Sequence, residues 1–371
     1  MKLALRELVR RPGRFVTATV ILTLIAILLM FLGGLLDGLI RTSTGAVAAQ
    51  QADALVFSKS SQASFLRSRI EIDTRSTIEA ELDTEVGGLG VVLLGARVPG
   101  NGPRDLANVA VWGYELAPSG VPEPPGPGQA WADELLRADG VEIGDQLLVG
   151  PARTPITVTG WVKDTSYNGQ AGLWTDVDTW RNVLQANRPD AALAEGVFQA
   201  LVVRDRSTES TGADTPGAVE ELLDDRVIAL TVAEAIDEIP GVTEQQTTFN
   251  QILGVTVVIA LVVIALFFAL LTVERTALYG VLKAIGARTG TIFAGLVVQA
   301  VAVTFIAAVI AGVAVIVLDL LIPPGSIPLS LSPGRIVTSV VLLLIAAVIG
   351  CAFSLRRVLR VDPASALGGS Q

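Results

Sequence analysis

Four long stretches of the chain contain no charged side chain. They cover residues 15–36, 245–273, 289–318 and 336–355. A helix that crosses a bilayer needs about 20 mostly apolar residues, so each stretch is long enough to do so. The pattern therefore predicts four transmembrane helices. We place them at 14–40, 250–273, 289–318 and 335–356.

A long segment, 41–249, separates the first predicted helix from the second and alternates apolar runs with polar loops. Strands are predicted at Ala54–Phe57, Val91–Leu94, Val109–Trp112, Gln146–Val149, Ile156–Val162 and Phe198–Val203. Helices are predicted at Ala130–Ala138, Ala218–Arg226 and Val232–Ile239. The last of these follows a capping box from Thr231 to Glu234. The predicted fold class is an α+β integral membrane protein, with four transmembrane helices and one large mixed α/β extracytoplasmic domain inserted between helices 1 and 2.

Two further features of this segment depend on its polar residues. The run from Pro118 to Gly128 holds five prolines and three glycines, which predicts a loop, and Ser207–Gly217 is a second, polar loop. Adjacent carboxylates such as Asp133 and Glu134 point apart on a helix. We therefore expect them to be solvated surface and not an acid/base pair.

The charge distribution predicts the orientation. Residues 41–250 carry 31 acidic and 15 basic side chains, whereas the rest of the chain carries 5 and 12. If the helices alternate, eleven of these 12 basic residues fall on the side of both termini, and only Arg335 lies opposite. Basic residues near membrane ends favour the cytoplasm. We therefore expect a bacterial cell-membrane protein with both termini cytoplasmic, an extracytoplasmic loop at 319–334 and a cytoplasmic tail at 357–371.

The first thirteen residues are basic and partly apolar. Residues 2–11 can form an amphipathic helix on the inner membrane surface, and Pro12-Gly13 would end it. A plain basic flank is the alternative. The following apolar stretch could also be read as a secretory signal, but it is too long for a signal core, so a membrane anchor is the better interpretation.

Several kinds of chemistry are excluded by what the sequence lacks. There is no histidine, which removes Ser-His-Asp catalysis and the commonest metal ligand, and there is no phosphate-binding Gly-x-x-x-x-Gly-Lys-Ser/Thr loop. We therefore predict no catalytic residue, no metal and no cofactor, so ATP would be bound by a partner.

The net negative charge of the 41–250 segment disfavours binding of nucleic acid. The single cysteine, Cys351, means that the segment folds without disulfides.

The short segment 274–288 lies between two transmembrane stretches and has helical periodicity. Leu278, Val281, Leu282 and Ile285 fall at i, i+3, i+4 and i+7, which predicts an amphipathic cytoplasmic helix. Most of its polar residues, including Glu274 and Lys283, lie on the other side. Which face would contact a partner stays open.

Four residues near the predicted outer ends of helices 1 and 2 are candidates for contact with a cargo. Met30 could be a soft ligand, although a packing role is the simpler interpretation. Asp37 closes helix 1 and follows Gly34 in a small-xxx-small pattern. Glu244 and Gln245 precede helix 2.

The layout and three motifs resemble the MacB/FtsX class of ABC-transporter permeases. The motifs are ERTALYGVLKAIGA at 274–287, LRRVLRVDPASALGG at 355–369, and GVEIGDQLLVGPARTPITVTGWVKDTSYN at 140–168. Within the class, FLGGLLDGLIR at 31–41 and ADALVFSKSS at 52–61 are similar to HrtB-like haem-efflux permeases. DevC-like permeases are the next most similar.

The resemblance implies an exporter permease without its own ATPase site. Two permease copies and two cytosolic ATPase subunits would assemble in membrane lipid, and ATP-driven motion would reach the exported domain through helices 1 and 2. It implies that the ATPase contacts the 274–288 helix, through Glu274, Arg275, Leu278, Tyr279, Val281, Leu282, Lys283, Ile285 and Gly286. It implies an amphipathic or hydrophobic cargo, with haem as one candidate, near Met30, Asp37, Glu244 and Gln245.

Two other functions remain open on the sequence. An FtsX-like signal transmitter would regulate an extracytoplasmic enzyme and move no cargo. A DevC-like permease would export a lipid or glycolipid.

Overall fold

A computed structural model describes residues 12–102, 104–206, 215–223, 226–274, 285, 289–322 and 327–358 of the chain. The chain folds into two compact units. The helical unit contains Met1–Asp37, Thr247–Ile322 and Leu329–Gln371, and the sheet unit contains Gly38–Gln246 and Pro323–Pro328. Each unit has its own hydrophobic core.

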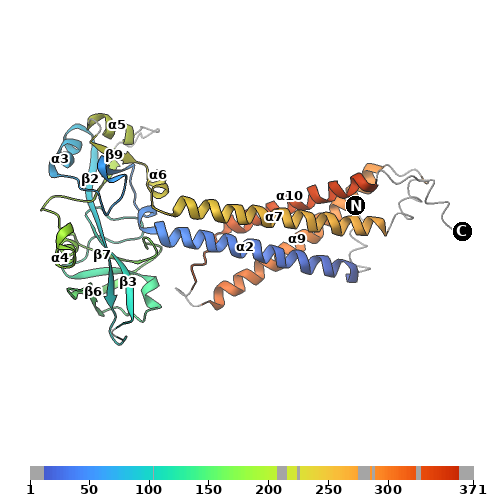
Figure 1. The fold of residues 1–371 in the computed structure, drawn as a ribbon, viewed down its shortest axis with the longest axis horizontal. Helices are drawn as coiled ribbons and strands as arrows, with labels where there is room; N and C mark the ends of the chain where they lie inside the picture. The colour runs from blue at the N-terminus through green and yellow to red at the C-terminus, as the bar shows by residue number, and fades with distance from the viewer. Residues whose placement is uncertain are drawn as a thin grey trace. The chain divides into compact units, whose positions relative to one another are not determined.

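The helical unit draws on four long helices, which are α2 (Pro12–Ala48), α7 (Val242–Val273), α9 (Thr289–Leu321) and α10 (Pro333–Val358) (Figure 1). All four are long and apolar enough to cross a membrane. They share two buried clusters, one of which joins Phe15 of α2, Phe268 of α7, Ala300 of α9 and Cys351 of α10. Many outward side chains on the same helices are large and apolar, as lipid contact requires.

Helices α2 and α7 run beyond their apolar stretches. Helix α2 continues from the helical unit into the sheet unit as far as Ala48, and α7 begins in the sheet unit at Val242. Each helix continues past its apolar stretch because neither extension contains a proline that would break it, and polar residues are also compatible with a helix. Each of these helices is therefore one unbroken element that contributes residues to both units.

In the residues that the structure describes, the sheet unit contains nine strands, shorter helices and three single-turn 3-10 helices. The strands are β1 (Ala54–Ser58), β2 (Thr84–Arg97), β3 (Leu106–Tyr114), β4 (Gln129–Asp133), β5 (Gln146–Val149), β6 (Thr154–Val162), β7 (Ala171–Thr175), β8 (Ala200–Asp205) and β9 (Val227–Leu230). The helices are α3 (Ile72–Glu81), α4 (Val177–Asn187), α5 (Thr215–Leu222) and α6 (Val232–Asp237), with η1 (Lys59–Ser61), η2 (Glu134–Arg137) and η3 (Pro189–Ala191).

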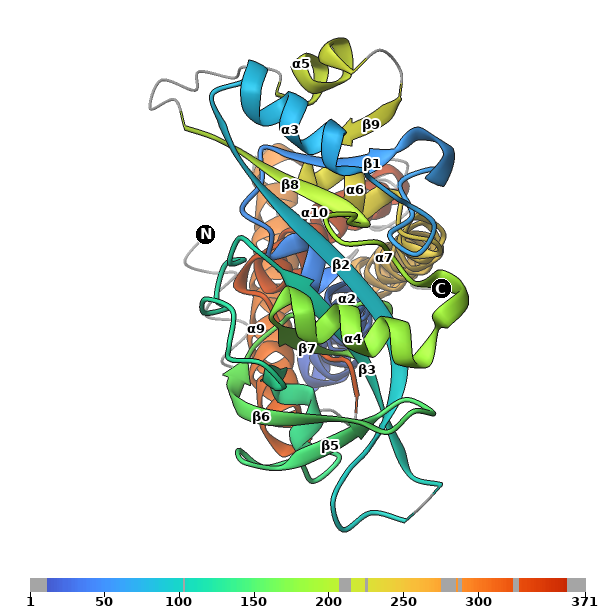
Figure 2. The same ribbon diagram turned by 90° about the vertical axis from the view of Figure 1, so that its left-hand side faces the viewer.

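The strand pairings close a ring. Strands β3, β7, β4, β6, β5 and β2 pair in that order, and β2 pairs back to β3. Strands β8, β1 and β9 extend the sheet from the first half of β2. Figure 2 shows β2 running from the part of the unit that holds α3 and β9 to the part that holds β5 and β6. Strand β2 therefore belongs to both parts of the sheet.

The sheet has a hydrophobic core on each face. Along β1, Ala54 and Val56 belong to one buried cluster and Leu55 and Phe57 to the other. All four side chains are fully buried. Because both faces of β1 are covered, its sequence is a continuous apolar run. The second cluster holds stacked and edge-to-face aromatic pairs, including Trp112 with Trp174 at 5.2 Å between ring centroids.

The predicted fold class is confirmed, since four apolar helices accompany one mixed α/β sheet domain between the first two. The capping box at Thr231 and Glu234 is present and opens α6. All six predicted strands exist; β5 matches at both ends, and the other five differ at one or both ends. The run from Pro118 to Gly128 contains no helix or strand.

The prediction of a helix over Ala130–Ala138 was wrong. Its first residues belong to β4, where Ala130 and Ala132 are buried between β6 and β7, and only Glu134–Arg137 is helical. The Asp133 carboxylate accepts a hydrogen bond from Leu135 N and caps this turn. Asp133 is 2% exposed and not solvated as expected.

The second predicted helix is shifted along the chain. Helix α5 begins at Thr215 and ends at Leu222, so it starts inside the expected Ser207–Gly217 loop. Residues 207–214 and 224–225 of the two segments lie outside the described residues. Arg226 immediately precedes strand β9.

Candidate functional site

The cargo-contact candidate Asp37 forms an ion pair with Arg335 within the helical unit. Asp37 lies in α2 and Arg335 in the first turn of α10. Arg335 Nε donates to Asp37 Oδ2 at 3.0 Å, and its Nη2 donates to Asp37 Oδ1. The side chains are 20% and 25% exposed. The two parallel hydrogen bonds fix the start of α10 against α2.

Glycines in α2 allow this close approach. A Cβ built on Gly33 would lie 2.8 Å from Arg335 Cδ, and one on Gly34 would lie 2.9 Å from the side chains of Leu329 and Leu331. Ser330 N also donates to the Gly34 carbonyl at 3.0 Å. The segment before α10 therefore packs directly on the glycine face of α2.

Met30 lies two turns before Asp37 on α2 and is 1% exposed. It belongs to a buried apolar cluster to which α2, α7, α9 and α10 all contribute. The surrounding side chains include Ala26, Ala260 and Ala311, whose small size leaves room for the thioether. In this arrangement Met30 fills the core of the helical unit.

The other two cargo candidates lie in the first turn of α7, within the sheet unit. Glu244 is exposed, and Gln245 is half-buried. The Gln245 Oε1 atom is buried and has no hydrogen-bond partner in the described part of the chain. Met30 and Asp37 thus belong to one unit and Glu244 and Gln245 to the other.

Most of the predicted coupling segment lies outside the described residues. Helix α7 ends at Val273, where Glu274 N still donates to Leu270 O at 3.0 Å. Ile285 is 80% exposed. The remaining predicted contact residues, Arg275, Leu278, Tyr279, Val281, Leu282, Lys283 and Gly286, are not described.

The end of α2 is bound to the loop between β6 and β7, and both belong to the sheet unit. Ala46 N donates to Ser166 O at 2.9 Å, Asn168 N donates to Ser43 O at 2.9 Å, and Gly169 N donates to Thr42 O at 3.0 Å. These bonds join helix backbone to loop backbone directly. We call residues 163–170 the clamp loop.

Side chains and a glycine add to the contact at the clamp loop. Arg41 Nη1 pairs with Asp164 Oδ2 at 3.1 Å, at an exposed position. A Cβ on Gly45 would lie 2.3 Å from the Asp164 carbonyl oxygen, so only glycine fits there. Asp164 and Asn168 have φ of 55° and 50°, in the left-handed region that Asn and Asp tolerate better than most residues.

The other side of the clamp loop is anchored in the sheet core. Thr165 donates from both N and Oγ1 to Asp133 Oδ2 at 2.8 Å. Desolvation raises the pKa of Asp133 above its ordinary value, although these hydrogen bonds oppose the shift. Tyr167 packs edge-to-face on Trp112 at 5.3 Å, and burial raises its pKa to about 12. The loop thus links α2 to two buried groups of the sheet.

The sequence held weak signals for the two residue groups that we did not predict. Arg335 is the one basic residue that the charge count places opposite the termini, and Asp37 is the acidic residue that closes helix 1. Their opposite charges are compatible with a pair but do not specify it. For the clamp loop the signal was Asn168-Gly169, a dipeptide typical of turns. Nothing in the sequence indicated that this turn contacts residues 42–46.

Metal binding has no support in the described ranges. No group of three or more Asp, Glu, Cys or His side chains there is arranged to hold an ion.

Comparison with known proteins tests the predicted resemblance. Residues 250–363 match the FtsX-like permease C-terminal family. An uncharacterized ABC transporter permease of Mycobacterium tuberculosis is 27% identical over 99% of both chains. Together with the four apolar helices and the sheet domain, these matches confirm the predicted resemblance: the chain is similar to ABC transporter permeases of the MacB/FtsX type, and its long apolar helices support a multi-pass membrane protein. Similarity to such permeases implies a cytosolic ATPase partner.

A particular set of relatives matches the whole chain. A putative hemin transport system permease protein, HrtB of Staphylococcus epidermidis, is 23% identical and covers 100% of both chains. HrtB of Staphylococcus haemolyticus is 20% identical with the same coverage. The crystal structure of the periplasmic region of MacB from Actinobacillus actinomycetemcomitans aligns at 12% identity and a TM-score of 0.37, over 53% of this chain and 96% of that one.

Proposed function

We propose that this chain is the permease subunit of an ABC exporter, in which a separate cytosolic ATPase drives extrusion of an amphipathic or hydrophobic cargo by mechanotransmission. A dimer of the chain with two ATPase subunits forms the working complex in membrane lipid. Both termini are cytoplasmic in this proposal, and the sheet unit is extracytoplasmic.

The continuity of α2 carries the proposal. One helix of 37 residues contains a membrane-crossing stretch, and its last turns bind the clamp loop. The other side of that loop is anchored to Asp133 through Thr165 and to Trp112 through Tyr167. A helix transmits axial displacement along its length because its backbone hydrogen bonds link successive turns. Movement of α2 therefore reaches the β6–β7 turn through three backbone hydrogen bonds.

We propose haem as the cargo to test first. The support is similarity over the whole chain to proteins described as hemin transport permeases. Haem combines an apolar ring with two carboxylates, which suits entry from the membrane plane. Met30, Asp37, Glu244 and Gln245 remain the cargo-contact candidates.

The test is reconstitution of the chain with its ATPase in liposomes, followed by measurement of ATP hydrolysis and of haem movement. Reversing charges in the coupling segment (Glu274→Lys, Arg275→Glu and Lys283→Glu together) should uncouple hydrolysis from haem movement. Asp319→Arg, an exposed charge near the end of α9, is the control and should leave coupling intact.

Three outcomes contradict parts of the proposal. Unchanged coupling in the triple variant removes the role of the 274–288 segment. ATP hydrolysis without movement of haem, but with movement of a labelled glycolipid, replaces haem with a DevC-like cargo. Hydrolysis that moves neither and instead activates a bound extracytoplasmic hydrolase makes the chain a signal transmitter.

A further inference from the structure

Strand β2 has a stretch of edge that no other strand covers. Strand β8 pairs with one edge over Thr84–Leu89, whereas β3 pairs with the other edge only from Leu89 onward. Just past the end of β3, Glu115 N also donates to Gly88 O at 3.1 Å. Among the residues that the structure describes, no strand lies along this second edge between Thr84 and Gly88. A free edge offers backbone N–H and C=O groups, which an added strand can bind.

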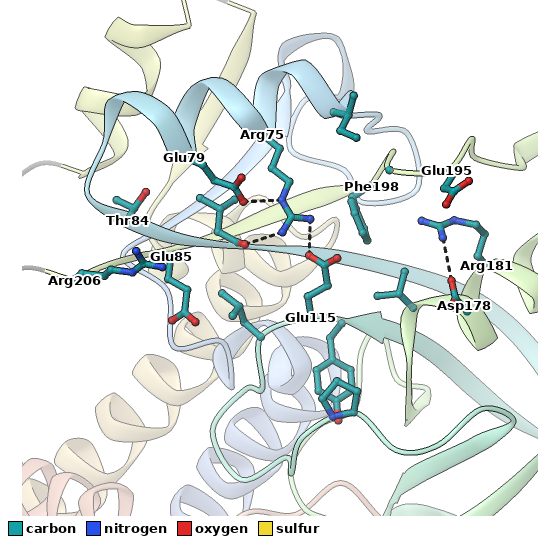
Figure 3. Close-up of a pocket in the computed structure, with 17 residues that line it drawn as sticks. Arg75, Glu79, Thr84, Glu85, Glu115, Asp178, Arg181, Glu195, Phe198 and Arg206 are labelled. Carbon is teal, nitrogen blue, oxygen red and sulfur yellow. Dashed lines mark hydrogen bonds and ion pairs between the residues drawn. The ribbon is translucent and has the colours of Figure 1, made fainter.

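Two side chains occupy the place of the missing strand (Figure 3). Glu115 Oε2 accepts a hydrogen bond from Gly88 N at 2.7 Å, and Arg75 Nη2 donates to Val86 O at 3.2 Å. Arg75 Nη1 lies 2.7 Å from the same Glu115 oxygen. The pair therefore satisfies one donor and one acceptor of the edge, as the peptide group of a neighbouring strand would.

The Arg75–Glu115 pair covers this edge from a partly exposed position. Its side chains are 26% and 32% exposed. Arg75 makes a further ion pair with Glu79 at 2.8 Å, on its own helix α3. That second partner can hold the guanidinium when it leaves the edge.

The covered edge opens into a cleft of the sheet unit with a volume of about 1140 Å³. Helix α3, the end of β3 and the start of α4 surround it (Figure 3). Ile72 of α3 lies on its wall with 64% of its surface exposed. Four strand residues span about 13 Å at 3.3 Å per residue, so the edge from Thr84 to Gly87 matches a segment of at least four residues.

The charged side chains that line the cleft favour a cationic ligand. The lining of the cleft holds five carboxylates and three guanidinium groups, which are Glu79, Glu85, Glu115, Asp178 and Glu195 against Arg75, Arg181 and Arg206. Glu85 and Glu195 are exposed and have no ion-pair partner in the described ranges. Residues 41–250 as a whole carry a net charge of −16. An anionic ligand is therefore disfavoured, and a cationic one is attracted.

We propose that this cleft is a docking site for an extended basic segment of a partner polypeptide, which adds to the Thr84–Gly88 edge of β2 as a further strand. Its backbone C=O accepts from Gly88 N, and its N–H donates to Val86 O, after the Arg75–Glu115 pair turns aside. Lysine or arginine side chains of the segment pair with Glu85 and Glu195. The backbone hydrogen bonds to β2 supply the affinity. The carboxylates of Glu85 and Glu195 supply the preference for a positively charged segment.

The test uses the full chain in lipid nanodiscs and a fluorescein-labelled eight-residue peptide of alternating lysine and valine. Binding is followed by fluorescence anisotropy. Two matched peptides serve as controls, one with glutamate in place of lysine and one with every backbone nitrogen methylated. The basic peptide should bind, and both controls should bind at least tenfold more weakly, because one has the wrong charge and the other cannot donate hydrogen bonds.

Variants locate the site. Glu85→Lys and Glu195→Lys should each weaken binding of the basic peptide by about tenfold, whereas Glu142→Lys should not. Glu142 is exposed on the same unit but does not line the cleft. Arg75→Met with Glu115→Met removes the competing cover and should tighten binding by about tenfold.

The proposal is overturned if neither the natural chain nor the Met double variant binds the basic peptide. Equal binding of the methylated peptide removes strand addition, and equal loss of binding in Glu142→Lys removes the cleft as the site. Glu85 and Glu195 are exposed, so the Glu85→Lys and Glu195→Lys variants should fold. Their peptide affinities therefore test the site even if the Met double variant does not fold.

Discussion

The Asp37 carboxylate receives two hydrogen bonds from the guanidinium of Arg335, and this pair joins α2 to the first turn of α10. Removing one partner leaves the other charge largely buried without compensation. We therefore expect Asp37→Ala to lower the free energy of unfolding by about 2–4 kcal/mol. Thermal unfolding of the full chain in detergent measures the loss.

Two variants make this test specific. Exchanging the charges (Asp37→Arg with Arg335→Asp) should restore much of the lost stability, because the pair is re-formed. Asp319→Ala removes an exposed carboxylate from α9 and should leave Tm unchanged. Equal Tm values for Asp37→Ala and Asp319→Ala would show that the pair contributes no stability.

Replacing Met30 separates a packing role from contact with cargo. Its side chain is 1% exposed, so Met30→Ala should cost about 2–4 kcal/mol through the cavity that it leaves. Met30→Leu conserves volume and should cost less than about 1.5 kcal/mol, with haem movement unchanged. Transport assays on the Leu variant decide the matter, since a transport loss at native stability would mean that the sulfur contacts the cargo.

A methyl group at Gly45 should disturb the clamp loop. The Gly45→Ala side chain would meet the Asp164 carbonyl oxygen at 2.3 Å, so the loop or the helix must shift, at a cost of about 1–3 kcal/mol. Under the proposed mechanism, coupling of ATP hydrolysis to transport should also fall. Gly254→Ala in α7 meets no atom within 4 Å and should be neutral or stabilising. A Gly45 variant with normal Tm and normal coupling would contradict both expectations.

Asp133 should contribute a pH dependence to stability. Because its pKa is raised in the folded state, the folded chain binds more protons than the unfolded chain between the ordinary value of 3.8 and the raised pKa. Stability from this group therefore falls as pH rises through that window and stays low above it. The measurement is the difference in unfolding free energy between the natural chain and Asp133→Asn, at several pH values. A constant difference across the window would mean that Asp133 has an ordinary pKa.

Hydrophobic pattern was sufficient for the four long helices and for strands such as β1 and β5. Strand β1 is a nearly continuous apolar run because both of its faces are buried, whereas β5 alternates buried and more exposed positions. The pattern failed where glycine stands in a strand. Strand β2 extends through Gly88 and Gly90, which read as breakers, but Phe198 and Trp180 occupy the space where their Cβ atoms would be. Helix α3 was missed because Ile78 is its one buried residue.

Helix α4 was missed although the signals were present. Asp176 caps it by accepting from the backbone of Asp178 and Thr179, and Trp180, Val183 and Leu184 form its buried face. For the candidate sites, the sequence supplied Asp37 and Met30 as single residues. It could not supply their partners, because Arg335 is 298 positions from Asp37 and only the tertiary fold joins them.

Strand β2 is shared by the closed ring and by the β8–β1–β9 extension, and this has a consequence for how the sheet unit comes apart. Neither part can lose its order without breaking hydrogen bonds of the strand that the other part needs. The two should therefore melt in one cooperative step, and the central β2 amides should be among the slowest in the unit to exchange with solvent deuterium.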